Sequence, residues 1–436
     1  MSHRNAVELA PTQTKERITL LDSLRGIAVL GILIMNIPFF GLPDPAGYNP
    51  IALNEIGTIN EKIFIVVNGY LDGTQRAIFS MLFGAGILLF ISRLEARADG
   101  MKPADYFIRR QLWLLVFGLF NAYLLLWPGD ILFPYAVCGI ILFVFRKLNA
   151  KGLIFAAFIC LILMTIRENI DLYRTKQKIY KGEKAQLISA NQRTEEQKDE
   201  IAALNKMKEE SNPESVKTEM NHILKKMKGS FFDAYDYFKD LNYKIESSFV
   251  LIKIWDILIF MFLGMAFFKT GILTGEASSK FYWGLLLIGL SLGGFLSWYY
   301  FKDVVRFQYN QFEIARNTSF KFYEIARVTR SLGFFALLLL LYKSGLVTWL
   351  FNLMKPVGQM AFTNYLTQSF FCNLFFLGAG FDMIGSFDRK GVYLFMLIVW
   401  VVQIIWSHLW LRYFRYGPLE WCWRSLTYWE IQPMRK

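Results

Sequence analysis

Long apolar segments separated by short polar connections make up most of this chain. A run of about 20 apolar residues is long enough for a helix to cross a bilayer. Ten segments approach this length, five in each half of the chain: 20–40, 76–92, 111–126, 131–145, 152–166, 249–268, 281–301, 331–342, 357–377 and 392–410. The eighth is short, so we expect its helix to begin earlier, within 324–330. The pattern predicts an all-α, polytopic transmembrane bundle of about ten helices.

A hydrophilic stretch, 167–248, divides these segments into two groups. Glu, Lys, Gln and Ala dominate this stretch, and Pro213 alone interrupts its central part. Such a composition favours exposed amphipathic helices. The sequence therefore predicts an N-terminal membrane half (1–166), a helical insertion (167–248) and a C-terminal membrane half (249–436). We expect the insertion to form a helical hairpin that caps the bundle, with partial disorder as the alternative.

The distribution of basic residues predicts how the bundle is oriented. The chain carries a formal net charge of +13, and the insertion contributes little of it because its basic and acidic residues nearly balance. Lys and Arg gather in the short connections and terminal segments, mostly on the side that includes both termini. Because cytoplasmic loops carry an excess of Lys and Arg, we expect both termini in the cytoplasm and the insertion outside. The basic connection 302–330 departs from this rule. The charge is therefore interpreted as a topology signal, and no nucleic-acid partner is expected.

The sequence has no pattern typical of a metal site or of a tightly bound cofactor. Its four cysteines lie in apolar or aromatic surroundings without metal-ligand spacing: Cys138, Cys160, Cys372 and Cys422. They are interpreted as small core residues. The sequence contains no glycine-rich phosphate loop, HExxH, GxSxG or CxxC motif.

Three polar residues share one face of the first apolar segment. Asp22 precedes Arg25 by one turn, and eleven residues, or three turns plus roughly 20°, separate Arg25 from Asn36. Polar groups at this depth are costly in hydrocarbon, so they should face a protein interior or a wet cavity. Two interpretations remain open. One is a structural ion pair near the membrane interface, and the other is a ligand site with Asp22, Arg25 and Asn36 as substrate-binding residues.

Further polar side chains are expected inside the bundle. Asp72 and Arg76 form an i,i+4 pair of opposite charge, with Asp72 as a candidate catalytic residue and Arg76 as a candidate substrate-binding residue. Asp130 begins the fourth helix, where it is either an N-cap or a catalytic carboxylate. Asn364 and Gln368 belong to a polar stripe on the ninth segment. They form interhelical hydrogen bonds or contact a substrate.

His408 is the one histidine within a predicted span. The other two, His3 and His222, lie in the N-terminal tail and in the insertion. If catalysis requires an imidazole base inside the membrane, that base must be His408. The alternative is an interfacial histidine that hydrogen-bonds to a neighbour. Arg412 and Arg415 share its helical face.

Four motifs are similar to those of one family. They are LLDSLRGIAVLGILIMNI near the N-terminus, FSMLFGAG at 79–86, GDILFPYAVCG at 129–139 and SHLWLRYFRYGPLEWCWRSLTYW near the C-terminus. Together they resemble the YeiB-like bacterial membrane proteins, which contain domain of unknown function 418. The resemblance covers most of the chain apart from the insertion, and it implies a multi-pass protein of the bacterial plasma membrane.

That family is similar to transmembrane acyltransferases, which take an acyl group from cytoplasmic acyl-CoA. The resemblance implies acyl-CoA as the donor, a lipid or cell-envelope acceptor, and arginines that hold the donor phosphates. The candidates for this cofactor-binding role are Arg93, Arg97, Arg109, Arg110, Arg412 and Arg415. Asn36 departs from the pattern, because the polysaccharide O-acyltransferases carry a histidine at this spacing and asparagine accepts no proton near neutral pH. Either His408 or a carboxylate then serves as the base, or the scaffold no longer performs this chemistry.

Three functions follow from these observations. The favoured one is an integral-membrane, acyltransferase-like enzyme. The second is a non-enzymatic transporter or exporter of a small amphipathic molecule, which would pass the charged pairs of the first two segments. The third is an envelope protein that binds membrane lipids or docks a partner through the insertion. The sequence leaves the acceptor and the oligomeric state open.

Overall fold

Every regular element of the structure is a helix. The computed structural model describes residues 18–97, 100–248 and 254–436, and within these ranges the β-type pairing is a single bridge between Phe414 and Arg435. Six helical stretches of the described chain are long and apolar enough to cross a membrane: Thr19–Gly41, Ile59–Arg97, Ala150–Gln186, Ser279–Arg306, Tyr323–Ser344 and Arg389–Tyr413. The chain is therefore an all-helical, multi-pass membrane protein.

The first helix, α1 (Thr19–Gly41), lies at the centre of the bundle. Its neighbours are α3 (Thr74–Arg97), α14 (Thr348–Gln359), α15 (Ala361–Phe376) and α16 (Arg389–Tyr413). Protein buries 67% of the apolar window of α1 but only 22% of the window of α16. An apolar face that lacks protein cover suits contact with lipid. The same holds for two other peripheral helices, α6 (Ala150–Gln186) and α11 (Ser279–Arg306).

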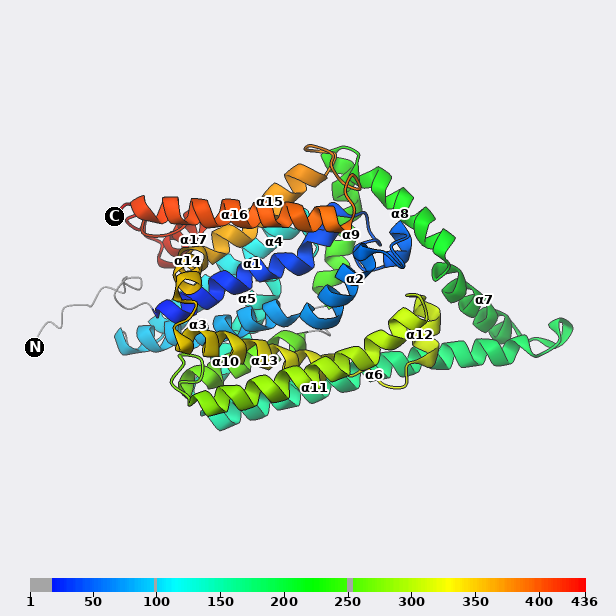
Figure 1. The fold of residues 1–436 in the computed structure, drawn as a ribbon, viewed down its shortest axis with the longest axis horizontal. Coiled ribbons are helices and arrows are strands. Elements are labelled where there is room, and N and C mark those ends of the chain that lie inside the picture. Colours follow the sequence, from blue (N-terminus) through cyan, green and yellow to red (C-terminus); the bar gives the residue numbers. More distant parts are fainter. Residues whose placement is uncertain (1–17, 98–99, 249–253) are drawn as a thin grey trace, which may run out of the picture.

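The bundle has two chemically different ends. Four further helices complete it: α4 (Lys102–Tyr123), α5 (Leu132–Phe145), α10 (Ile254–Lys269) and α13 (Tyr323–Ser344). The end at which α1 begins also holds the C-terminus and α17 (Pro418–Tyr428), and we call it the terminal end (Figure 1). The opposite end holds α2 (Ile59–Val66), α12 (Gln311–Asn317) and the insertion helices, and we call it the insertion end.

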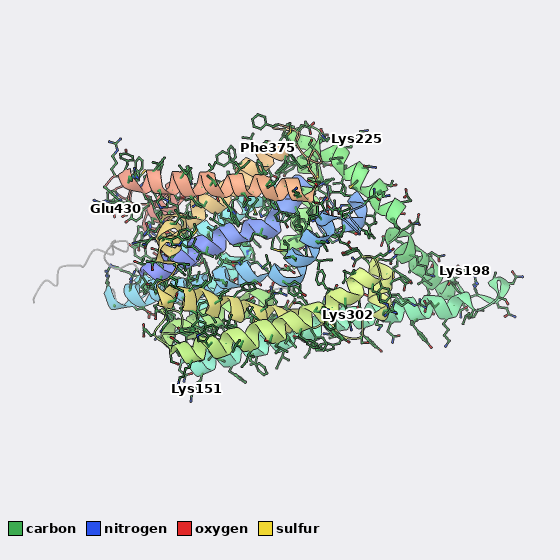
Figure 2. The ribbon with its side chains drawn as sticks, in the orientation of Figure 1. Lys151, Lys198, Lys225, Lys302, Phe375 and Glu430 are labelled. Carbon is green, nitrogen blue, oxygen red and sulfur yellow. The ribbon has the colours of Figure 1, made fainter. Side chains whose placement is uncertain are left out.

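The insertion is helical, and its first part continues a bundle helix. The predicted boundary between residues 166 and 167 falls inside α6, which runs unbroken to Gln186. Three helices follow: α7 (Glu195–Glu210), α8 (Pro213–Met227) and α9 (Phe231–Ser248). Figure 2 shows Lys198, on α7, at the tip that is farthest from the bundle, whereas Lys225, on α8, lies near Phe375 at the insertion end. The Asn242 side chain of α9 donates a hydrogen bond to the Ala122 carbonyl of α4, which ties the insertion back to the bundle.

Two predicted segments differ clearly from the observed helices. The eighth begins at Tyr323, which is earlier than its apolar run and one residue before the range 324–330 in which its start was expected. The predicted segment 357–377 is wrong as one helix, because a break at Met360 separates α14 from α15. Its physical cause lies in another element. The Glu420 carboxylate of α17 accepts hydrogen bonds from the backbone N–H groups of Phe362 and Thr363, and these bonds satisfy a new helix N-terminus.

Glycine permits α1 and α14 to approach each other very closely. A Cβ added at Gly358 of α14 would lie 1.7 Å from the Asp22 carbonyl oxygen, and one at Gly26 of α1 would lie 2.1 Å from the Met354 carbonyl oxygen. Any larger residue at either position would force α1 and α14 apart. Gly289 and Gly293 of α11 allow a second close approach, since both positions face the α13 backbone.

Candidate functional site

A cavity of about 250 Å³ lies at the terminal end, between α1, α3, α4, α15 and α17. Arginines from four helices line it: Arg25, Arg93, Arg110 and Arg424. Two carboxylates, Asp22 and Glu420, also belong to its wall. Cations therefore outnumber acids around this cavity, which favours an anionic ligand.

The deeper wall of the same cavity is apolar and aromatic. Phe79, Leu82, Phe83, Leu114 and Leu132 line it, with Tyr135 and Tyr365. On α3 the lining extends from Arg93 to Phe79, and fourteen residues of α-helix rise roughly 21 Å. That length is a large part of the roughly 30 Å hydrocarbon core of a bilayer. The cavity thus combines cationic groups with a long apolar floor, a combination that suits an amphipathic anion.

The predicted pair of α1 forms at the edge of this cavity. An Arg25 Nη1 group lies 3.0 Å from Asp22 Oδ1, and the Gln359 side chain donates to Asp22 Oδ2 over 3.3 Å. Asp22 is buried, whereas the Arg25 side chain is about one-quarter exposed. The structural ion pair is therefore present, and because it lies at a cavity, its role as a ligand site stays a prediction.

Arg110 is the cation with the most unusual surroundings. Its guanidinium carbon lies 3.7 Å from the centroid of the Trp423 ring and 4.8 Å from that of the Phe90 ring. The Trp423 indole donates a 2.9 Å hydrogen bond to the Arg110 carbonyl, which fixes α17 against α4. In the described part of the chain, the Arg110 guanidinium has no carboxylate partner. Contact with aromatic faces holds the guanidinium in place but leaves its N–H donors unused.

Glu420, by contrast, is fully engaged by the protein. It accepts hydrogen bonds of 2.8 Å from Phe362 N and 3.1 Å from Thr363 N, and the Thr363 hydroxyl donates to its second oxygen. Burial raises the pKa of Glu420, although the hydrogen bonds from Thr363 oppose the shift. This carboxylate caps α15, so it balances little of the positive charge around the cavity. The position of Glu420 at the N-terminus of α15 also suits the helix dipole, because an acid at a helix N-terminus is favourable.

Four predicted site residues meet at the cavity: Asp22, Arg25, Arg93 and Arg110. The others do not line it: Asn36, Asp72, Arg76, Arg97, Arg109, Asp130, Asn364, Gln368, His408, Arg412 and Arg415. Asn36 is half-buried on α1, beyond the lining residues of that helix. Arg109 pairs with Asp105 and donates to the Thr427 carbonyl, while Arg412 and Arg415 are exposed.

The predicted pair between Asp72 and Arg76 is wrong. Asp72 precedes α3, which begins at Thr74, so the two side chains do not share a helical face. Asp72 accepts a 2.8 Å hydrogen bond from the Tyr323 hydroxyl. Arg76 pairs instead with Asp256 of α10 over 2.8 Å. The local i,i+4 spacing was a poor guide because the chain turns between the two residues.

Arg76 belongs to a buried ion network that local sequence spacing did not reveal. Asp256 also binds Arg327 of α13, and Arg327 binds Glu324 one turn earlier. The Arg327 side chain is only 1% exposed. We use the term buried ion network for these four residues: Arg76, Asp256, Glu324 and Arg327. The available sequence signals were an acid inside the sixth predicted span and two charges at the start of the eighth.

Asp130 takes the N-terminal capping role that was one of its two interpretations. Its carboxylate accepts a 2.8 Å hydrogen bond from Phe133 N in the first turn of α5 and another from the Asn121 side chain. The residue lies in the connection between α4 and α5, outside the spanning helices. Burial raises its pKa to about 7, although both hydrogen bonds oppose the shift. Tyr365 lies between Asp130 and the cavity, since its hydroxyl bonds to the backbone of the adjoining Gly129 and Ile131.

The polar stripe of α15 forms interhelical hydrogen bonds. Asn364 donates to Ser407 of α16 and accepts from the Trp406 indole. Gln368 donates to Gln403 of α16 over 3.0 Å. His408 is half-buried on α16, and its Nδ1 lies 2.9 Å from the Ile404 carbonyl of the same helix. These contacts explain the polar residues by helix association, away from the cavity.

Several residues of the cavity were not singled out from the sequence. Trp423 and Arg424 lie in the C-terminal motif, but nothing in that motif indicates that α17 folds back against α4. Gln111 lies at the start of the third predicted span, where an amide in an apolar run was an available signal. No group of three or more His, Cys, Asp or Glu side chains in the described ranges is placed to hold a metal.

The fold and the cavity together define a multi-pass helical membrane protein with an amphipathic, cationic cavity. Residues 267–430 match the family described as Protein of unknown function (DUF418). The C-terminal part of the chain therefore matches this family, and the relatives described below align with the chain over nearly their whole length.

Three relatives illustrate the similarity. YxaH of Bacillus subtilis (strain 168) is 29% identical over 433 residues, which cover 98% of each chain. YeiB of Escherichia coli (strain K12) is 28% identical over 427 residues, or 94% of this chain and 96% of that protein. A 39.9 kDa protein in the amylase 3' region of Bacillus acidopullulyticus is 27% identical over 423 residues, or 96% of each. All three are described as uncharacterized, so their names assign no activity. No solved structure matches the chain.

Proposed function

We propose that this protein is an acyltransferase-like enzyme that binds acyl-CoA in the cavity at the terminal end and transfers the acyl group to a lipid or cell-envelope acceptor. The observation that carries the proposal is Arg110, a guanidinium without a carboxylate partner in the described part of the chain, at the edge of a deep apolar pocket. Arginine suits phosphate groups because its donors match them bidentately. The apolar lining suits the acyl chain.

The proposed orientation places the terminal end in the cytoplasm of a bacterium and the insertion outside. Basic residues are concentrated in the connections of that end, as the positive-inside rule requires for cytoplasmic loops. We further propose ten membrane crossings, by α1, α3, α4, α5, α6, α10, α11, α13, α15 and α16. Acyl-CoA is then available on the side where the cationic part of the cavity lies.

The proposed reaction needs a base, and Asp22 is the carboxylate best placed for that role. Glu420 is occupied as the cap of α15, whereas Asp22 lines the cavity beside Arg25. The acceptor hydroxyl oxygen attacks the thioester carbonyl carbon, and the carbon–sulfur bond breaks. The hydroxyl proton passes to Asp22 and then to the departing thiolate, so that an ester and free CoA are formed.

The test is acyl-CoA turnover by the purified protein in lipid nanodiscs, followed by mass spectrometry of the lipid products. Asp22→Asn preserves the shape of the side chain but removes the base, so turnover should fall by about 100-fold or more while acyl-CoA binding remains. Asp171→Asn, an exposed residue of α6 outside the cavity, is the matched control. Absence of acyl-CoA binding at millimolar concentration would overturn the proposal.

A second function is favoured by one observation. None of the three predicted catalytic residues, His408, Asp72 and Asp130, lines the cavity. A cavity that binds an amphipathic anion without transferring its acyl group is the property of a transporter or exporter. Movement of labelled acyl-CoA or anionic lipid across proteoliposome membranes, without formation of new ester, would support this function. Such movement should be lost in Arg110→Gln.

A further inference from the structure

Gln111 is a buried amide that the protein itself leaves unsatisfied. Its side chain lines the cavity, and the residue is only 1% exposed. Its Oε1 atom is enclosed and accepts no hydrogen bond. In the described part of the chain, its Nε2 group donates none either. Buried side-chain amides normally find partners, because a buried group without one loses the hydrogen bonds that water would provide.

The surroundings of the Gln111 side chain indicate which of its amide atoms faces the cavity. Oε1 points to Gly139 of α5, where an added Cβ would lie 2.5 Å away. The amide nitrogen is not enclosed in this way, so it is the part of the side chain that meets the cavity. This nitrogen can only donate. The complementary ligand group is therefore an acceptor such as a carbonyl oxygen.

Gln111 also lies at the level where the cavity changes character. Its neighbour on the chain is Arg110, at the cationic part, and Leu114, one turn deeper, belongs to the apolar floor. In an amphipathic acyl compound, the carbonyl stands between the phosphate-bearing part and the hydrocarbon chain. Along the cavity wall, the guanidinium of Arg110, the amide of Gln111 and the apolar side chain of Leu114 follow one another in the same order.

We propose that Gln111 donates a hydrogen bond to the acyl carbonyl of the bound ligand, an ester or thioester whose chain lies in the apolar floor. This inference rests on the proposed function and specifies the group that the site recognises. The shared chemistry is an acyl carbonyl next to an anionic group. It is available from acyl-CoA as a thioester and from an anionic glycerolipid as an ester.

The test compares ligands that differ only in the carbonyl. Palmitoyl-CoA and its thioether analogue S-hexadecyl-CoA are titrated against the full-length protein in nanodiscs, and dipalmitoyl phosphatidylglycerol is compared with its dihexadecyl ether analogue. Wild type should bind the carbonyl member of the productive pair about tenfold more tightly. Gln111→Leu should bind both members equally, with the affinity of the thioether or ether unchanged.

Two further readouts separate carbonyl recognition from a general packing effect. Gln111→Leu should raise the thermal midpoint of the ligand-free protein, because it removes an unpaired buried amide. Gly139→Ala keeps glutamine at position 111 but should reduce the carbonyl preference. The added methyl group would displace the Gln111 Oε1 atom and so reorient the amide. Gln177→Leu, on an exposed part of α6, is the control and should keep the full preference.

The outcomes distinguish this inference from the proposed function. Equal binding of carbonyl and carbonyl-free ligands by wild type overturns the role of Gln111 but leaves acyl-CoA binding intact. A Gln111-dependent preference confined to the glycerolipid pair supports carbonyl recognition and overturns acyl-CoA as the donor. If neither pair binds, both proposals are overturned.

Discussion

The two charged regions of this protein differ in how their charges are matched. In the buried ion network, Asp256 contacts both Arg76 and Arg327, and Glu324 contacts Arg327, so two acids neutralise two guanidiniums. At the terminal cavity, four arginines are present with Asp22 and Glu420, and Glu420 is occupied as a helix cap. The first region is complete without a ligand, whereas in the second the Arg110 guanidinium has no carboxylate partner in the described part of the chain.

Burial of charged side chains is therefore not by itself a sign of a ligand site. A closed, neutral network joins α3, α10 and α13, and its removal should affect folding. An arginine without an acid partner, beside an apolar cavity, should affect binding instead. Variants in the two regions therefore separate stability from affinity.

The largest effect on stability is expected for Arg327→Met. This change leaves Asp256 and Glu324 without their shared partner, and breaking a buried pair costs about 3–5 kcal/mol. The measurement is unfolding of the purified protein in detergent. The control is Arg316→Met, because Arg316 pairs with Glu183 on the surface and such pairs contribute about 1 kcal/mol or less. Equal losses in both variants would contradict the distinction.

Arg110→Gln should have the opposite signature. The change removes a cation that no described acid neutralises, so we expect little loss of stability. The affinity for acyl-CoA should fall about 10- to 100-fold, the effect of a hydrogen bond to a charged group. Calorimetric titration measures it, with Arg415→Gln, an exposed residue just after α16, as the matched control. Unchanged affinity in Arg110→Gln would mean that the anion binds elsewhere.

A smaller effect is expected for Asp130, and it should depend on pH. The pKa of this carboxyl rises in the folded protein to about 7 from an ordinary value near 3.8. The protonated Asp130 carboxyl therefore contributes its full stabilisation at a pH below 3.8, the ordinary pKa of this group. This contribution is lost as the pH rises through about 7, its pKa in the folded protein. The thermal midpoint of wild type should fall over this interval more than that of Asp130→Asn. Parallel curves for the two proteins would show that Asp130 does not titrate there.

His408→Ala should have the smallest effect. Its imidazole contacts a carbonyl of its own helix and does not line the cavity. Both acyl-CoA affinity and turnover should remain close to those of wild type, and the same assays measure them. A selective loss of turnover would restore His408 as the catalytic base and would contradict the role proposed for Asp22.

The sequence was sufficient for features that depend on local pattern. Apolar segment length predicted the bundle helices closely at α1 and α5, and the i,i+3 spacing predicted the pair between Asp22 and Arg25. Arg93 and Arg110, which the family resemblance implied for the donor phosphates, line the cavity, but their contact with phosphate stays a prediction. These results depend on residues that are near one another in the chain or on composition.

Features that depend on distant contacts could not be predicted in the same way. The partner of Arg76 is Asp256, which is 180 positions away, and a nearby acid, Asp72, was the wrong choice. The break at Met360 depends on the carboxylate of Glu420, which belongs to α17. The whole of α16 separates α15 from α17 in the sequence. His408 was selected because it was the one histidine in a predicted span, but helix rotation decides which side chains reach a cavity.

The most direct test of the central claim is a cryo-electron microscopy structure of the protein in nanodiscs with saturating S-hexadecyl-CoA, which cannot transfer its chain. The account predicts phosphate density at Arg25 and Arg110 and alkyl density along Phe79 and Leu114 at the terminal end. Ligand density at another site would contradict this claim, and so would a saturated sample in which the cavity contains no ligand density.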